Sequence, residues 1–277
     1  MEFYTTEKIT DQITLIRSAC GELLYLVEGT EKAALIDTCT GVGHLKALVD
    51  SLTDKPVTVL LTHGHVDHAP GAPEFDTVYM NHLDLPLYRR FCALEERQGY
   101  LQACLGPRYA ELSGSDFVLP EPDKEFLPLK DGMSFDLGGL HIDAYDLHGH
   151  TPGCMVFLIR EARVLILGDA CNNSTFIFDN DASPLAEYRE NLRQAQGKLA
   201  GKFDRVFLAH HDMETGTDIM DNVLALCDEV LANGGSDDVP YEFMGMHAFI
   251  AKKCNERFQR DDGKCGNFIY SKEKLYK

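Results

Sequence analysis

The sequence predicts an α/β protein built from two similar halves. In each half, one short apolar run ends in an aspartate, a helical pattern follows, and a second apolar run ends in a histidine. These strand ends carry Asp37 and His63 in the first half, and Asp169 and His210 in the second. Two strand–helix–strand halves can bury their apolar faces as two sheets packed face to face with helices outside. The expected fold is therefore a four-layer αββα sandwich with two pseudo-duplicated halves.

Apolar periodicity sets the elements expected in the first half. Alternation and turn signals predict three strands within residues 11–38, and a helix is expected over residues 41–52. Residues 57–61 are β-branched residues and leucines, a run too short for a helix and typical of a buried strand. Asp84 has an N-cap side chain, and apolar residues recur after it at helical spacing, so residues 85–104 are expected to form a helix.

The second half is marked by turn signals and short apolar runs. Glycine-containing turns flank residues 133–137, and residues 140–147 alternate as strands do, which predicts a hairpin. The strand–helix–strand pattern that follows is expected in residues 164–167, 184–199 and 206–209.

The chain shows no Gly/Ser or proline-repeat linker, and 277 residues can fill a single α/β domain. We therefore expect one domain over residues 1–277. It carries a helical and loop insertion at about residues 81–130. The irregular part of this insertion, residues 106–128, would form one wall of the active-site cleft or an oligomer contact. Residues from about 237 to 277 are expected to be a tail that caps the fold.

Composition excludes several partners. The 44 acidic residues exceed the 26 Lys and Arg by 18, and such a surface repels a phosphate backbone. The sequence shows neither a signal peptide at its start nor an apolar run that could span a bilayer. Nine cysteines without a C-x-x-C pair suit buried or free thiols in a reducing compartment better than a disulfide framework. We expect a cytoplasmic protein that acts on a small molecule rather than nucleic acid or membrane, and that could form a homodimer.

The strongest functional signal is a segment that directly follows the strand expected at residues 57–61, Thr62-His63-Gly64-His65-Val66-Asp67-His68. In an extended segment His63 and His65 point to one side, while a turn lets Asp67 and His68 face a neighbouring point. A catalytic zinc takes about four neighbours at roughly 2.0–2.2 Å and keeps one place for water, so one ion cannot use all four side chains. The motif therefore indicates binding of more than one ion.

Three more potential ligands follow downstream, each after an expected strand as in the first motif. His150 lies in a Gly-His-Thr-Pro-Gly turn after an expected strand, Asp169 follows residues 164–167, and His210 follows residues 206–209. With these residues the chain offers seven ligands, enough for two ions that share one carboxylate and a hydroxide. His211 is an alternative to His210, because the two histidines are adjacent.

The sequence resembles the metallo-β-lactamase superfamily in four motifs that occur in the same order. They are the H-x-H-x-D-H pattern, the Gly-His-Thr-Pro-Gly turn, the Gly-Asp strand end and the late histidine. The resemblance spans residues 13–212. It implies an αββα sandwich with a dinuclear site. The ligands it implies are His63, His65 and His150 for the first ion, Asp67, His68 and His210 for the second, and Asp169 as the bridge.

The resemblance also assigns supporting roles. Asp37 corresponds to an acidic residue that supports the ligand loop. His148 replaces the family's proline before the Gly-His turn, and is expected to support a ligand or face the substrate. The family's lactonases have a tyrosine three residues after the bridging aspartate, where this chain has Asn172. Asn172 is therefore a second candidate for supporting a ligand or facing the substrate. His211 is the third, should His210 be the ligand.

Two divalent ions lower the pKa of the water they share, so a hydroxide nucleophile exists at neutral pH. Zinc is the expected ion, and manganese or iron(II) also accept histidine and carboxylate ligands. Asp67 and Asp169 are the catalytic candidates, since Asp67 could orient the hydroxide and Asp169 would bridge the ions. The leading hypothesis is a dinuclear metallohydrolase that cleaves a small ester, thioester, lactone or amide.

Two other classes remain open. One is an iron-dependent oxidoreductase, either a persulfide dioxygenase or a diiron enzyme, although the diiron type has Glu at the position of His65. The other is a non-catalytic metal-binding module, which would be expected to have lost ligands. Iron content with oxygen consumption would favour the first class, and a two-ion centre without an open coordination position would favour the second.

Overall fold

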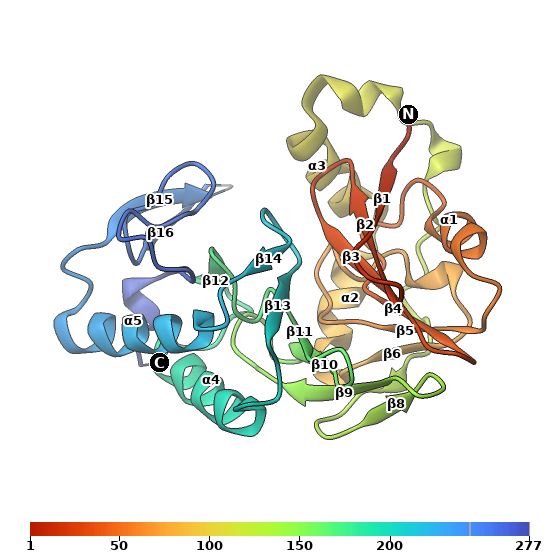
Figure 1. The fold of residues 1–277 in the computed structure, drawn as a ribbon. Coiled ribbons are helices and arrows are strands. Elements are labelled where there is room, and N and C mark those ends of the chain that lie inside the picture. The colour runs from red at the N-terminus through yellow and green to blue at the C-terminus, as the bar shows by residue number, and fades with distance from the viewer. Residues whose placement is uncertain (244, 277) are drawn as a thin grey trace. The chain divides into compact units, whose positions relative to one another are not determined.

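The computed structural model describes residues 1–243 and 245–276. The chain divides into two compact units, residues 1–144 and 145–277. Each unit contains strands and helices (Figure 1). Each also has its own hydrophobic core. Among the described residues, no helix is both long enough and apolar enough to cross a membrane.

A seven-stranded sheet forms the centre of the first unit, with its strands in chain order. The first four strands pair antiparallel, and each later strand runs parallel to its neighbour. The strands are β1 (Tyr4–Lys8), β2 (Ile13–Ser18), β3 (Leu23–Glu28), β4 (Ala33–Ile36), β5 (Val57–Leu60), β6 (Val78–Met80) and β7 (Leu127–Pro128). Since β4 and β5 are parallel, the residues that follow them lie at the same edge of the sheet.

The three strands predicted within residues 11–38 are β2, β3 and β4. Strand β1 was not predicted, because only Tyr4 of its five residues is buried and the rest show no apolar alternation. Helix α1 (Leu45–Leu52) begins later than the predicted residue 41. Gly41 and Gly43 have φ angles of 67° and 83°, which a right-handed helix cannot include.

The helix predicted over residues 85–104 is two helices, α2 (Leu85–Phe91) and α3 (Leu94–Leu105). They separate at Ala93, whose ψ of 138° is extended. Apolar spacing continues through the break, so periodicity alone could not reveal it. The residues after α3 form two short 3₁₀ helices, Gly106–Glu111 and Gly114–Asp116, before β7.

Helix α3 is fastened to the loop after β4 by a buried arginine. The guanidinium of Arg97, which is fully buried, donates to the carbonyls of Thr40 and Val118, each at 2.7 Å, and to the carbonyl of Gly41. These bonds satisfy the buried charge and three backbone acceptors together. The contact ties the insertion to the sheet of its own unit.

A disulfide joins Cys20, between β2 and β3, to Cys104 in the last turn of α3. The expectation that no cysteines would pair is wrong for these two, since residues 84 positions apart meet only in the folded chain. The other seven cysteines lie outside this disulfide, and five of them are buried.

The hairpin predicted from the two glycine turns is β8 (Ser134–Asp136) with β9 (His141–Asp146), and β9 runs across the boundary between the units. In the second unit β10 (Met155–Ile159), β11 (Val164–Gly168), β13 (Arg205–Leu208) and β14 (Glu214–Thr215) lie side by side. Strands β11 and β13 are parallel, so the residues that follow them also share one sheet edge. Both strands closely match the predicted ones.

A four-stranded sheet completes the second unit. Its strands, in spatial order, are β12 (Thr175–Ile177), β17 (Phe268–Tyr270), β16 (Met246–Ile250) and β15 (Val239–Phe243). Residues after 237 thus supply three of its strands. The assignment of the chain to a single domain, with an insertion at about 81–130 and a capping tail at about 237–277, stays a prediction.

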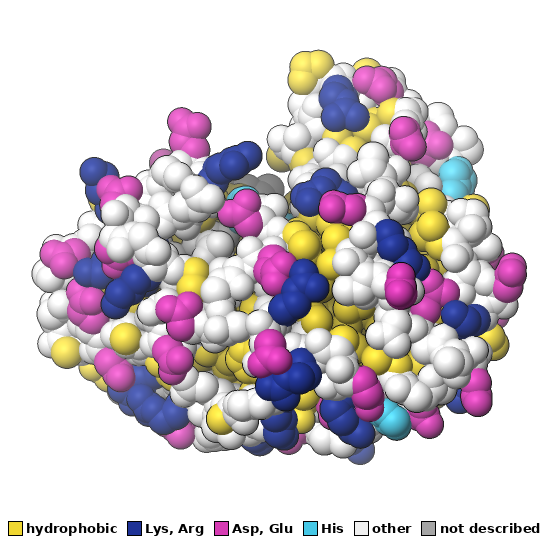
Figure 2. All heavy atoms as spheres, in the orientation of Figure 1, with side chains coloured by type: hydrophobic (Ala, Val, Ile, Leu, Met, Phe, Trp, Pro, Cys, Tyr) yellow, Lys and Arg dark blue, Asp and Glu magenta, His cyan; other side chains and the backbone are white. Residues whose placement is uncertain are grey.

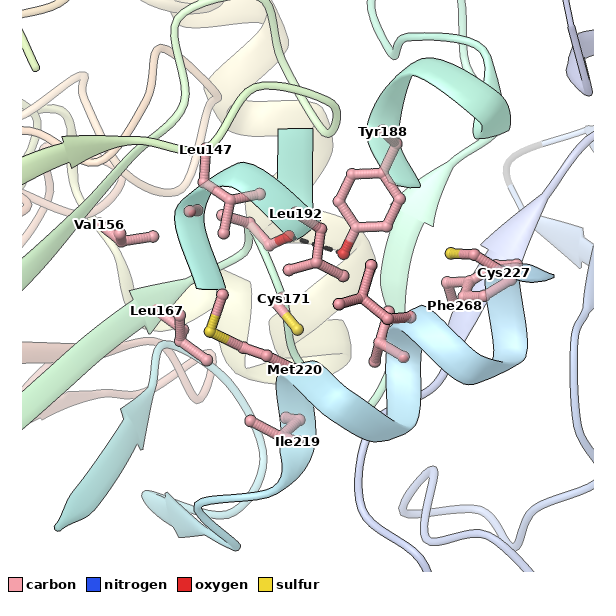
Figure 3. Close-up of a cluster of buried hydrophobic side chains, with 14 of the residues drawn as sticks. Leu147, Val156, Leu167, Cys171, Tyr188, Leu192, Ile219, Met220, Cys227 and Phe268 are labelled. Carbon is pink, nitrogen blue, oxygen red and sulfur yellow. Dashed lines mark hydrogen bonds between the residues drawn. The ribbon is translucent and has the colours of Figure 1, made fainter. Parts of the chain in front are cut away.

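The core of the second unit lies between its first sheet and two helices, α4 (Leu185–Leu199) and α5 (Ile219–Asn233). Figure 3 shows Leu192 and Tyr188 of α4 packed with Met220 of α5 and with strand side chains such as Leu167. The predicted helix over residues 184–199 is α4, and Pro184 is its N-cap residue. This packing fixes α4 beside the turns that follow β9 and β11.

The acidic excess is dispersed on the face drawn in Figure 2, where lysine and arginine side chains lie among the carboxylates. Ion pairs such as Arg163–Asp204 at 2.6 Å and Arg193–Asp228 at 3.5 Å account for part of this mixing. Exposed pairs of this kind contribute little to stability.

We expect Leu192→Ala to lower the free energy of unfolding by about 2–5 kcal/mol, because it leaves a cavity at a fully buried position of α4. The neighbouring Arg193→Ala is the control, since that side chain is 46% exposed and should change stability little. Urea unfolding monitored by circular dichroism would measure both. Equal losses in the two variants would contradict the packing described for α4.

Candidate metal centre

The predicted motif of the first unit lies in the loop that directly follows β5. His63 and His68 are buried, while His65 and Asp67 are partly exposed. The backbone N–H groups of His68 and Ala69 both donate to the carbonyl of His65, which makes the tight turn expected near Val66. The sequence thus places four potential ligands after the carboxyl end of a parallel strand.

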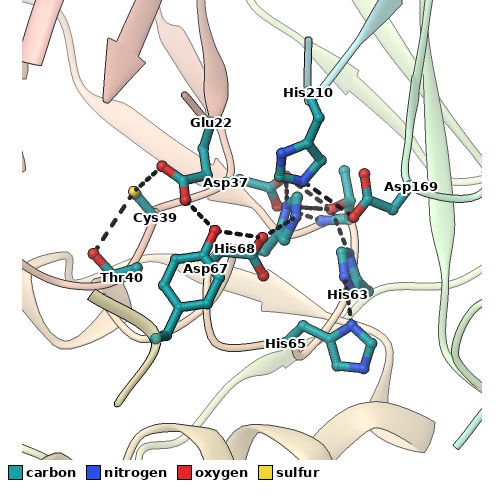
Figure 4. Close-up of polar contacts among 12 residues, drawn as sticks. Glu22, Asp37, Cys39, Thr40, His63, His65, Asp67, His68, Asp169 and His210 are labelled. Carbon is teal, nitrogen blue, oxygen red and sulfur yellow. Dashed lines mark hydrogen bonds and ion pairs between the residues drawn. The ribbon is translucent and has the colours of Figure 1, made fainter. Parts of the chain in front are cut away.

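Asp37, which follows the neighbouring strand β4, holds this loop (Figure 4). Its Oδ1 accepts the backbone N–H of Thr62 at 2.7 Å, and its Oδ2 accepts the Thr62 hydroxyl at 2.8 Å. Oδ2 also accepts Nδ1–H of His68 at 2.8 Å. A carboxylate bound to Nδ1 fixes the ring tautomer, so that Nε2 is the nitrogen that could bind a metal.

The rings of His63 and His65 face each other through single nitrogens. Nε2 of His63 lies 3.2 Å from Nδ1 of His65. Two nitrogens bound to one tetrahedral zinc, each at about 2.0–2.1 Å, lie roughly 3.3 Å apart. Asp67 and His68 form the second pair, with ligand atoms within 4.8 Å of each other. Both pairs therefore fit the predicted division of the motif between two ions.

Gly64, between the two histidines, is packed against the start of α2. Its N–H donates to Oδ2 of Asp84 at 2.9 Å, and a Cβ there would lie 2.8 Å from the Asp84 carbonyl oxygen. Asp84 was expected to cap the helix with its side chain. It occupies the N-cap position, but its fully buried carboxylate binds the motif instead.

Tyr100 of α3 contacts the Asp67 carboxylate through its hydroxyl. The Tyr100 hydroxyl lies 3.3 Å from Oδ2 of Asp67 and also bonds to Oε1 of the buried Glu22. Burial raises the pKa of Tyr100 well above its usual value, and the charges of Asp67 and Glu22 add to the effect. The phenol is therefore neutral and serves as a hydrogen-bond donor.

In the second unit, His150 is oriented by a backbone carbonyl. Its Nδ1 lies 2.8 Å from the carbonyl oxygen of Phe176 in β12, so Nδ1 carries the hydrogen and Nε2 is the nitrogen that could bind a metal. That Nε2 lies 3.8 Å from Oδ2 of Asp169. The Gly-His-Thr-Pro-Gly turn and the end of β11 therefore bring these two predicted ligands together.

Asp169 presents the same oxygen to a second histidine. Its Oδ2 also lies 3.2 Å from Nε2 of His210, which follows β13 (Figure 4). Its Oδ1 accepts a hydrogen bond from Nδ2 of Asn172 at 3.2 Å, and Asn172 is itself fixed by the backbone N–H of Ser174 at 2.6 Å. One carboxylate oxygen facing two imidazole nitrogens is the arrangement expected of a bridging ligand.

Tyr188 of α4 supports both ligand turns of this unit. A Cβ on Gly149 would lie 2.2 Å from Cδ2 of the Tyr188 ring, and the Tyr188 hydroxyl donates to the carbonyl of Ala170 at 2.9 Å. The ring thus lies between the residue before His150 and the residue after Asp169. Figure 3 shows it in the buried core.

The remaining predicted residues have other contacts. Nε2 of His148 lies 3.3 Å from Oδ2 of Asp146, and the His148 carbonyl accepts a hydrogen bond from Asn191. His211 has a φ of 60°, and its Nε2 lies 3.4 Å from the Ser174 hydroxyl. Its ring packs against Phe258 at a tilt, with ring centroids 5.1 Å apart. His210 rather than His211 therefore points toward Asp169.

Sequence reasoning missed several supporting residues. Asp84 was predicted as a helix cap and not as a partner of the motif. No sequence pattern pointed to Glu22, Tyr100 or Tyr188. Each acts across more than ten residues of sequence, so no local spacing could reveal the contact.

A family model described as the metallo-beta-lactamase superfamily matches residues 18–210. The chain is 33% identical over 139 residues to an uncharacterised protein of Mycobacterium bovis, covering 48% of this chain and 57% of that protein. It is 24% identical over 217 residues to the acyl-coenzyme A thioesterase MBLAC2 of Bos taurus, covering 68% of this chain and 74% of the relative. The match thus spans little more than half the length of the mycobacterial relative.

Among solved structures, the metallo-beta-lactamase from Pontibacter korlensis has a TM-score of 0.58 and 18% identity, and the match covers 81% of this chain and 99% of that one. The chain therefore belongs to the metallo-β-lactamase superfamily. This confirms the predicted family and α/β fold class. Family and side chains together indicate metal binding and fit a metal-dependent hydrolase.

Gly149→Ala tests the packing of the His150 turn. The added methyl would overlap the Tyr188 ring, so we expect the free energy of unfolding to fall by about 1–3 kcal/mol. Gly197→Ala within α4 is the control, because its Cβ meets nothing within 4 Å and alanine favours the helix. Chemical denaturation of metal-free protein would compare them, and a Gly149→Ala variant as stable as the native protein would refute the contact.

Proposed function

We propose that the protein is a dinuclear metallohydrolase that cleaves a small acyl ester or thioester. The observation that carries the proposal is the orientation of ligand atoms inside each unit. Nε2 of His63 faces Nδ1 of His65 at 3.2 Å, and one oxygen of Asp169 faces Nε2 of both His150 and His210. Both arrangements suit bound cations.

Under this proposal seven side chains hold two divalent ions, with zinc as the expected ion and manganese or iron(II) as alternatives. When bound, the two ions lower the pKa of the water between them and supply a hydroxide nucleophile at neutral pH. The ligands would be His63, His65 and His150 for one ion, Asp67, His68 and His210 for the other, and Asp169 between them.

The chain's own residues set the geometry of the site. Asp37 and the Phe176 carbonyl select the ligand nitrogens of His68 and His150. Asn172 orients the Asp169 carboxylate through Oδ1 and leaves Oδ2 toward the histidines. Asp67 is the one motif carboxylate, so it is the residue that would orient the nucleophile and take up its proton.

An acyl thioester is the substrate we favour within this class. The support is the bovine relative named as an acyl-coenzyme A thioesterase, which this chain matches over 68% of its length. A small, activated acyl carbon also suits a site whose nucleophile is a hydroxide rather than a Ser or Cys side chain.

We also propose a cytoplasmic location and a small-molecule substrate. Seven cysteines outside the disulfide, five of them buried, support a reducing compartment. The Cys20–Cys104 pair opposes it. Thiol labelling of protein taken directly from cells would decide between the two, since a fully labelled chain supports the cytoplasm and a protected pair contradicts it.

Metal analysis coupled to an activity panel tests the function. Purified protein should carry two equivalents of metal and hydrolyse acyl thioesters faster than lactones, phosphodiesters or β-lactams. His65→Ala and Asp169→Ala should each lower kcat/KM more than about 100-fold, because each removes a ligand outright. His141→Ala is the matched control, since that imidazole lies in β9 near Asp136 and has no expected ligand role.

Two results would overturn the proposal. One is less than one equivalent of metal in the native protein, and the other is full activity in either ligand variant. Iron content with oxygen uptake on a persulfide would point to the oxidoreductase class instead.

A further inference from the structure

We propose that helix α3 positions the metal ligand Asp67 through Tyr100, so that binding of the ion at Asp67 is coupled to the order of this helix. The inference rests on the proposed two-ion site and adds a positioning residue to it. It assigns a role to α3, the second helix of the predicted insertion. All of the contacts that carry it lie within the first unit.

Tyr100 is the residue that connects α3 to the motif. Its hydroxyl lies 3.3 Å from Oδ2 of Asp67 and bonds to Oε1 of Glu22. A phenol has a single proton and therefore can donate fully to only one of these carboxylates at a time. A cation on Asp67 would offset that carboxylate's charge and allow the hydroxyl to contact both oxygens without repulsion.

Glu22 fixes Tyr100 from the side of the sheet. The Glu22 side chain is 2% exposed, and its Oε2 accepts from the Ser18 hydroxyl and from the Cys39 thiol, the latter at 3.6 Å. The Ser18 hydroxyl in turn accepts the backbone N–H of Glu22 at 3.2 Å. Because β2 and the following turn set its position, the carboxylate is a fixed anchor for the Tyr100 hydroxyl.

Two further contacts hold the same face of α3. Arg97 binds three backbone carbonyls, and Cys104 is disulfide-bonded to Cys20. Residues 97, 100 and 104 are separated by three and four positions, which places them on one side of a helix. Tyr100 therefore lies between two fixed points, and its hydroxyl has little freedom to leave Asp67.

This arrangement couples two events. An ordered α3 holds Asp67 in place for the ion, and by linkage the ion bound to Asp67 must stabilise α3 to the same extent. Outer partners of metal ligands change metal affinity by about 10–100-fold. Since the Tyr100–Asp67 contact is 3.3 Å long, we expect the lower end of that range.

Tyr100→Phe tests the proposal, because it removes only the hydroxyl. Zinc-loaded protein would be titrated with a chelator, and released zinc would be measured with a colorimetric indicator. We expect one of the two ions to dissociate at about 10-fold lower chelator concentration than in the native protein, while the other is unchanged. Tyr109→Phe is the control, since it makes the same substitution in the 3₁₀ helix after α3.

The outcomes separate this inference from the proposed function. Native protein that binds no metal overturns the proposed function itself. Native protein with two ions, whose release is the same in Tyr100→Phe, overturns only the role of Tyr100. An equal weakening of both ions, accompanied by a lower unfolding temperature of the metal-free variant, shows a merely structural tyrosine and also overturns the proposal.

A second measurement needs no variant. Amide hydrogen exchange of residues 98–104 should slow when zinc is added to metal-free native protein, because the ion stabilises α3 through Asp67 and Tyr100. Helix α1, which carries none of these contacts, serves as the internal reference. Exchange in α3 that does not respond to zinc would contradict the coupling, and in Tyr100→Phe the response should be lost.

Discussion

The buried carboxylate of Asp37 is the interaction on which the ligand loop depends. It follows β4, whose parallel neighbour β5 delivers Thr62 and the motif to the same sheet edge. With three donors from Thr62 and His68, a carboxylate that is 3% exposed is fully engaged. Losing it would leave the donors unpaired in the interior, which costs more than a single hydrogen bond contributes. The loop therefore has one conformation, and His68 one ring orientation.

The second unit reaches the same result with different chemistry. A backbone carbonyl of β12 orients His150, an amide orients Asp169, and the Tyr188 ring packs between their two turns. Both units place ligands in the turns that follow strands, and hold them with partners that are buried or half-buried. This agrees with the pseudo-duplication inferred from the strand–helix–strand pattern, although the supporting residues are not duplicated.

Sequence reasoning predicted well wherever a local pattern was sufficient. The strands before the ligands and helix α4 lie within a residue or two of their expected bounds, because short apolar runs next to turn signals are informative. Prediction from sequence failed where contacts between residues far apart in the chain determine the local structure. The break at Ala93, the role of Asp84 and the Cys20–Cys104 pair all depend on residues brought together by folding. The expected ligand roles stay predictions.

By itself the sequence determined which chemistry this protein can carry. Four potential ligands in six residues after a strand, with three more after later strands, predict a metal-binding α/β protein because strand period and ligand type are local properties. Only the tertiary structure decided which nitrogen of His68 and of His150 is bound by a protein acceptor, which of His210 and His211 turns toward Asp169, and what holds Asp67. These features depend on hydrogen bonds between side chains far apart in the chain, which only a folded backbone can bring within about 3 Å of each other.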